Sequence, residues 1–149
     1  MSDNLPEVEA ALRAWQSRVD QATNSAVSLI ARQMLIFAKK NADSAKNPPV
    51  RINGRLRYNP HIGPRSGEGP NRGTGNLLTS IHMSTRRQGF GTYTAEVGAG
   101  AIYARALEVG NPRWTSGVKY PYMQPALNEL VKGGKLSQIL AYSYRSLGG

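Results

Sequence analysis

Apolar residues along the first 40 positions recur at alternating spacings of three and four, which predicts one long helix from about residue 6 to residue 40. Only Gln33 breaks the apolar stripe of that helix. Pro6 suits the first turn, because its missing N–H would have no partner there. The stripe consists of Leu5, Val8, Leu12, Trp15, Val19, Ala22, Ala26, Leu29 and Ile36.

Such a helix is too long for the core of one small chain. At 1.5 Å per residue it would span roughly 50 Å, which exceeds the diameter of the core that 149 residues can build. We therefore expect part of the stripe to pack on another subunit, with Leu12, Trp15 and Val19 as candidate interface residues. The alternative is that the stripe covers the chain's own sheet. The apolar face widens towards the C-terminal end of the helix, which is therefore the expected place of the intrachain core.

Prolines and glycines interrupt residues 46–73, and basic side chains dominate the charge of this segment. Residues 50–58 alternate between apolar and basic, and Asn53-Gly54 is the favoured pair for a type I′ turn, so we expect a β-hairpin there. Residues 61–73 follow as a loop without periodicity. The arginines of this arm that could line a DNA channel or dock on a neighbouring protein are Arg51, Arg55, Arg57, Arg65 and Arg72.

A compact unit is predicted to resume at Thr74, which could cap a short helix that ends near Ile81. Two strands follow at residues 82–87 and 93–97, separated by a glycine-rich turn at residues 89–91. These elements predict an antiparallel hairpin.

Helices are predicted for the rest of the chain. Residues 102–109 form the first, and Gly110 ends it. A second helix begins within residues 121–125 and ends at residues 133–134, and residues 136–147 are compatible with a third. The side chains expected to fix the first of these helices on the sheet are Tyr103, Leu107 and Val109.

The order of these elements predicts an α+β fold with a small, mainly antiparallel sheet and two C-terminal helices. The expected parts are a long N-terminal helix (1–45), a basic Pro/Gly-rich hairpin and loop arm (46–73), a compact α+β core (74–134) and a C-terminal helical tail (135–149).

The charge of the chain changes the range of partners to consider. The formal net charge is +10 and the isoelectric point is about 10.3, a balance that favours polyanions such as nucleic acid or acidic proteins. There is no cysteine, which excludes disulfides and thiolate metal sites. No stretch approaches the roughly 20 apolar residues of a membrane span, and residues 1–4 do not resemble a signal peptide. We therefore expect a protein made in a reducing cytoplasm, with no membrane partner.

Catalysis is poorly supported by the residues. The only histidines are His61 in a predicted loop and His82 at a predicted strand start, too few for a metal site. The glycines of residues 63–75 lack the Gly-Lys-Ser/Thr ending of a phosphate-binding loop. Residues 98–100 before a helix are a weak match to an anion site and more typical of a tight turn. We expect no catalytic residues, no cofactor and no metal. An enzyme acting on nucleic acid would rest on charge alone.

Four elements of the second half occur in a distinctive order. Their key residues are Thr74, Gly75 and Leu77 before the hairpin; Tyr103, Leu107, Glu108 and Gly110 in the helix after it; and Pro121 and Pro125 at the start of the next helix. This ordered set resembles the neck and tail-completion proteins of long-tailed bacteriophages, in which a long N-terminal helix is also usual. The resemblance covers roughly residues 70–130.

The resemblance implies a function in assembly. It implies an α+β subunit of the virion that forms a ring, commonly a hexamer, which joins the head connector to the tail and surrounds the packaged DNA. The implied partners are other copies of the chain, the head-connector and tail-tube proteins, and the DNA. The implied places are the neck or tail of the virion and, during assembly, the host cytoplasm. No catalytic residues are implied.

Two features of the sequence leave alternatives open. The basic arm also fits a DNA-binding module without sequence specificity, because phosphate contacts need only Lys or Arg within reach. Trp114, in the variable loop before Pro121, is either an interface anchor or a local cap on the core.

Overall fold

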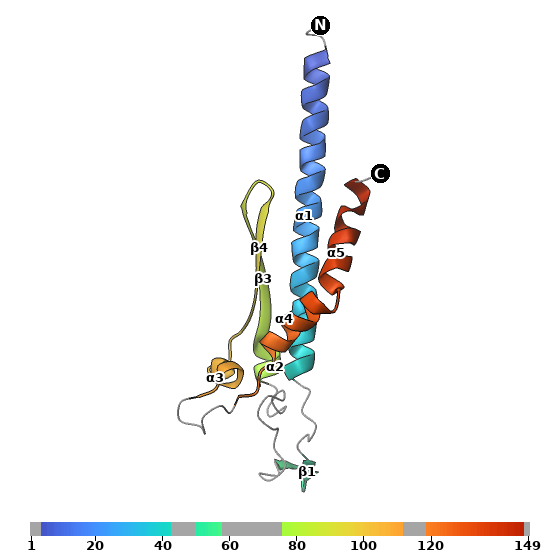
Figure 1. Ribbon diagram of the computed structural model, residues 1–149. Helices are drawn as coiled ribbons and strands as arrows, with labels where there is room; N and C mark the ends of the chain where they lie inside the picture. Colours follow the sequence, from blue (N-terminus) through green and yellow to red (C-terminus); the bar gives the residue numbers. More distant parts are fainter. Residues whose placement is uncertain (1–3, 43–49, 58–75, 112–118, 148–149) are drawn as a thin grey trace.

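The computed structural model describes residues 4–42, 50–57, 76–111 and 119–147. It shows the predicted α+β fold, arranged around one long helix (Figure 1). The N-terminal helix stands between an antiparallel hairpin on one side and the C-terminal helices on the other, as Figure 1 shows.

The long helix α1 covers Leu5–Ala42 and is 38 residues long. Its dipole is complemented by Glu7 in the first turn and by Lys39 and Lys40 in the last. Ala38 and Ala42 are buried near its C-terminal end, with Phe37 partly buried beside them. The expectation that the intrachain core lies at this end of the helix is therefore confirmed.

The main sheet is a hairpin of two strands, β3 (Ile81–Gly89) and β4 (Thr92–Ala99). The strands pair antiparallel from Ile81 opposite Ala99 to Gly89 opposite Thr92, with an irregularity between Arg87 and Gly89. One face of the hairpin packs on α1. Ile81 of β3 is buried on this face, and Val97 and Ala99 of β4 are partly buried beside it. A short helix, α2 (Asn76–Ser80), precedes the hairpin and buries Leu77. The predicted cap of this helix, Thr74, lies outside the described residues.

A second, separate hairpin consists of β1 (Val50–Ile52) and β2 (Arg55–Arg57). Asn53 and Gly54 form its turn with φ angles of 50° and 75°. A type I′ turn needs positive φ at both central residues, which asparagine and glycine tolerate best. The predicted hairpin and its turn are confirmed.

Helix α3 covers Ala104–Val109 and ends at Gly110, whose φ of 89° disfavours any residue with a Cβ. The prediction that Tyr103 and Val109 fix this helix on the sheet is wrong. Both are exposed, whereas Ala104 is buried and Leu107 packs against the core. A helix of six residues presents one face to the core, and positions 104 and 107 share that face while 109 does not.

The C-terminal part consists of α4 (Met123–Lys132), α5 (Lys135–Tyr144) and a 3₁₀ turn (Arg145–Leu147). Both α4 and α5 pack on α1. The hydrophobic core joins α1, α2, β3, α3 and the start of α4. Its buried residues are Ala38, Ala42, Leu77, Ile81, Ala104, Tyr122 and Ala126.

Candidate functional site

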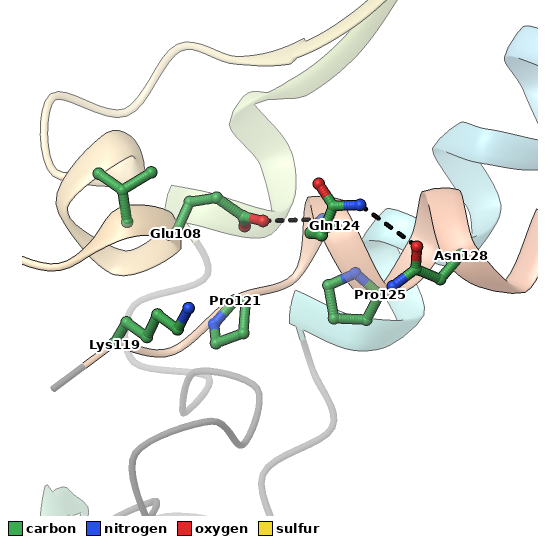
Figure 2. A pocket seen from close by; sticks show the side chains of 7 residues that line it. Glu108, Lys119, Pro121, Gln124, Pro125 and Asn128 are labelled. Carbon is green, nitrogen blue, oxygen red and sulfur yellow. Dashed lines mark hydrogen bonds between the residues drawn. The ribbon is translucent and has the colours of Figure 1, made fainter. Parts of the chain in front are cut away.

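The carboxylate of Glu108 on α3 binds the N-terminus of α4. Its Oε2 accepts hydrogen bonds from the backbone N–H of Tyr122 (2.8 Å) and of Met123 (2.9 Å), and its Oε1 accepts one from Gln124 (2.7 Å). Figure 2 shows the bond to Gln124, with Glu108 reaching across from the neighbouring helix. We call this arrangement the Glu108 clamp.

The Glu108 clamp completes the first turn of α4. The first four N–H groups of a helix have no partner within the helix. Glu108 bonds the first three of them, and the fourth position is Pro125, which has no N–H. The negative carboxylate also lies at the positive end of the helix dipole. Two of the predicted motifs, one with Glu108 and one with Pro121 and Pro125, therefore meet in a structural joint.

Tyr122 links this joint to the core. Its side chain is 2% exposed, its hydroxyl donates a hydrogen bond to the carbonyl of Ala104 at 3.5 Å, and its own carbonyl accepts one from the Asn41 amide at 3.2 Å. Burial, with the nearby charge of Glu108, raises the pKa of Tyr122 to about 12. The tyrosine is therefore neutral at physiological pH and joins α1, α3 and α4.

An open cavity of about 460 Å³ lies beside the clamp, between α3 and the start of α4 (Figure 2). Its described lining carries one carboxylate, Glu108, and one ammonium group, Lys119, but no histidine or hydroxyl. Both oxygens of Glu108 already accept backbone hydrogen bonds. Among the described lining residues, the Glu108 carboxylate is therefore engaged in structural hydrogen bonds.

A second joint fixes the tip of the β3–β4 hairpin to α1. Asp20 accepts a hydrogen bond at Oδ1 from the Gly91 N–H and one at Oδ2 from the Tyr93 hydroxyl, both at 2.8 Å. The Arg87 guanidinium lies 3.5 Å from the same carboxylate. These contacts, above all the hydrogen bond from Gly91, lower the pKa of Asp20. We call this arrangement the Asp20 anchor; nothing in the sequence indicated it, because the partners lie 71 and 73 positions away.

The N-terminal part of α1 extends beyond both the hairpin and α5 (Figure 1). Residues 5–18, here called the projecting segment, are all exposed, and the first buried residue of α1 is Ala22. Near its C-terminal end α5 contacts α1 at Thr23, whose hydroxyl is hydrogen-bonded to that of Tyr144 at 2.8 Å. The large apolar side chains exposed on the segment, with their exposed fractions, are Leu5 (61%), Val8 (63%), Leu12 (53%) and Trp15 (49%).

The candidate interface residues are thus only partly brought together. Leu12 and Trp15 lie on the exposed stripe, and Val19 is half-buried at its end. Trp114 lies outside the described residues, as does Gly75 of the first motif.

The candidate DNA-channel arginines lie on or around the small second hairpin. Arg51 and Arg55 are exposed there, and Arg57 ends β2. Arg65 and Arg72 lie outside the described residues. In Figure 1 this hairpin is drawn at the opposite end of the molecule from the projecting segment.

The residues considered for chemistry are dispersed. His82 is exposed on β3, with Nδ1 2.9 Å from the carbonyl oxygen of Ser80, and His61 lies outside the described residues. Within the described ranges, no three His, Cys, Asp or Glu side chains gather in a way that could hold a metal ion. In the same ranges, no helix has the length and apolar character needed to cross a membrane.

No protein-family model, curated protein or solved structure matches the chain. The resemblance to phage neck proteins therefore stays a prediction from the ordered residues of the sequence.

Proposed function

We propose that this chain is a structural subunit of the phage neck, which assembles into a ring, with six copies expected, between the head connector and the tail. The ring would surround the DNA channel and complete the tail. The protein would be located in the virion and, before assembly, in the host cytoplasm. The observation that carries this proposal is the projecting segment, because its apolar stripe is exposed on a helix that is otherwise packed on both sides.

The spacing of that stripe favours a protein partner. Leu5, Val8, Leu12, Trp15 and Val19 follow the alternating three and four of a helix seam that packs against another helix or sheet. Monomeric proteins rarely expose a contiguous apolar patch of this kind without using it. A contact between unlike surfaces of two copies, repeated around an axis, forms a ring when the rotation between copies closes on itself.

The Glu108 clamp supports a structural function for the motifs. Both oxygens of its carboxylate accept hydrogen bonds from backbone N–H groups, so its role is to hold α4 in place. A subunit that must present fixed surfaces to neighbours benefits from such joints, because pre-organisation lowers the entropic cost of association.

A second candidate function is a basic DNA-binding module without sequence specificity. The exposed Arg51 and Arg55, with the net charge of +10, favour it. Phosphate contacts of this kind give binding that weakens steeply with salt. In the ring proposal the same arginines would face passing DNA or an acidic neighbour.

The test combines electron microscopy of assembled phage particles with mass measurement of the free protein. We expect a ring of this subunit at the head–tail junction. Leu12→Lys should remove the protein from particles, since it places a charge in the proposed interface. Ser17→Lys, exposed on the opposite face of the same helix, should assemble normally.

Absence of the wild-type protein from particles, together with a monomer that binds DNA in low salt, would replace the ring proposal by the DNA-binding module. Normal incorporation of Leu12→Lys would leave a neck function possible but would remove the projecting segment as its interface.

A further inference from the structure

We infer that the β3–β4 hairpins of adjacent copies pair edge to edge, with β3 of one copy beside β4 of the next, so that the assembled ring contains one continuous antiparallel sheet. The inference rests on the proposed function, since it needs a cyclic assembly. It adds the surface through which the copies meet, which is distinct from the projecting segment.

Both long edges of this hairpin are open among the described residues. β3 pairs with β4 and with no other described strand, so each strand has one side whose backbone groups face away from the sheet. The strands are nine and eight residues long, longer than a typical strand. An exposed edge of this length is a ready template for another strand.

The edges lack some of the features that usually prevent pairing, although β3 carries two arginines, Arg86 and Arg87. Neither strand contains proline or lysine, which natural edge strands use to block a further strand. The single irregularity, between Arg87 and Gly89, lies next to the turn. From Ile81 opposite Ala99 up to that point, the register is regular.

The hairpin is held in place before any partner arrives. Its base is fixed in the core by Ile81, and its tip is fixed to α1 by the Asp20 anchor. A strand that is already ordered gives up less conformational freedom when it pairs. One face is used by α1 and the other is polar and largely exposed, with His82, Ser84 and Glu96 on it. The edges are therefore the surfaces left for a further strand.

Cyclic symmetry selects which edges meet. Rotation about a ring axis keeps every hairpin pointing the same way, so β3 of one copy meets β4 of the next. Because the two strands of a hairpin are antiparallel, this contact continues the antiparallel pattern, and in a closed ring no edge stays unpaired. Pairing of β3 with β3, or β4 with β4, needs a two-fold axis and stops at two copies.

Charge favours the same choice. On the polar face, β3 carries Arg86 and β4 carries Glu96, at neighbouring positions of the ladder. Contact of β3 with β4 of the next copy brings these opposite charges within reach of each other, whereas β3 with β3 brings arginines together and β4 with β4 brings glutamates together. Opposite charges across strands stabilise pairing, and like charges destabilise it.

The chain has no natural cysteine, so single cysteines can report the contact. Ser84→Cys on β3 and Glu96→Cys on β4, which occupy facing positions of the ladder, are prepared as separate proteins, assembled alone or mixed, and oxidised, so that only cysteines on adjacent strands come within disulfide reach. We expect linked pairs of chains in the mixture and none in either protein alone. A Ser84→Cys chain that links to itself, or that links instead to Ser137→Cys on α5, would overturn the inference.

A charge swap gives an independent readout. Arg86→Glu should reduce the assembled fraction, by up to about fivefold for each contact, and Arg86→Glu with Glu96→Arg should restore it. Arg105→Glu, an exposed residue on α3, is the matched control. If rings form in particles and neither cross-link nor rescue is seen, the edge pairing is wrong while the neck function stands. If no rings form at all, both are wrong.

Discussion

Glu108 bonds backbone groups that lie 14 to 16 positions further along the chain. Helix caps are usually local, with a side chain just before the first turn satisfying the N–H groups of that turn. Here the residue before α4 is Tyr122, which makes no side-chain cap bond, and the cap comes from α3. The sequence singled out Glu108 and Pro125 as members of an ordered set, but their contact depends on how two helices pack and could not be read from local pattern.

Replacing Glu108 should destabilise the fold. Glu108→Ala leaves three N–H groups without their acceptor, so we expect the free energy of unfolding to fall by about 2–3 kcal/mol. Glu108→Gln keeps one acceptor oxygen and should cost about half as much. Urea denaturation followed by circular dichroism measures both. Glu7→Ala, on the projecting segment, should stay within about 0.5 kcal/mol of wild type. Equal effects for residues 7 and 108 would contradict the capping role.

At the scale of elements, the hairpin and α1 form one unit because the Asp20 anchor joins them near the tip. Most residues of β3 beyond its base are exposed, and an isolated two-stranded hairpin is at best marginally stable in water. Packing on α1 and the hydrogen bonds of the Asp20 anchor supply the stability that an isolated hairpin lacks.

The anchor should make the stability of this unit depend on acid. The pKa of Asp20 is lowered in the folded protein from an ordinary value of 3.8, so its contribution is present above that value and is lost as the pH falls through the lowered one. We expect the stability difference between wild type and Asp20→Asn to be constant near neutral pH and to shrink below about pH 4. Urea denaturation of both proteins from pH 7 to pH 2 measures it. A difference that does not change with pH would mean that the carboxylate charge is not used.

The elements themselves were largely predictable. The apolar spacing predicted α1, and alternation with turn residues predicted both hairpins, because these signals are local. The start of α3 was placed too early: Ile102 fits the pattern but lies fully exposed in a turn, where the Ala104 N–H bonds the Ala101 carbonyl at 3.0 Å. The elements that pack against so short a helix decide which of its faces is buried. The sequence does not show those neighbours, and for this reason Tyr103 and Val109 were wrongly predicted to contact the sheet.

At the scale of the whole molecule, two unlike surfaces lie far apart. The projecting segment offers apolar side chains at one end, and the hairpin with Arg51 and Arg55 offers positive charge at the other (Figure 1). The sequence predicted both surfaces from composition and spacing.

The basic hairpin should govern any binding of DNA. In Arg51→Ala with Arg55→Ala, the affinity for duplex DNA should fall without regard to sequence, and the slope of log affinity against log salt should decrease by up to about two. Fluorescence anisotropy over a salt series measures both quantities. Arg13→Ala with Arg18→Ala, which removes the same charge from the projecting segment, is the control. An equal loss in the control would assign binding to net charge alone.

The uninterrupted course of α1 has a mechanical consequence. Between Glu7 and Ala42 the helix contains neither glycine nor proline, so it lacks the residues at which helices most often kink. It can therefore act as a lever: a tilt imposed on the stripe at Leu12 is carried about 40 Å to Asn41, whose amide holds the carbonyl of Tyr122. Force applied by a neighbour at one end thus arrives directly at the joint between α3 and α4.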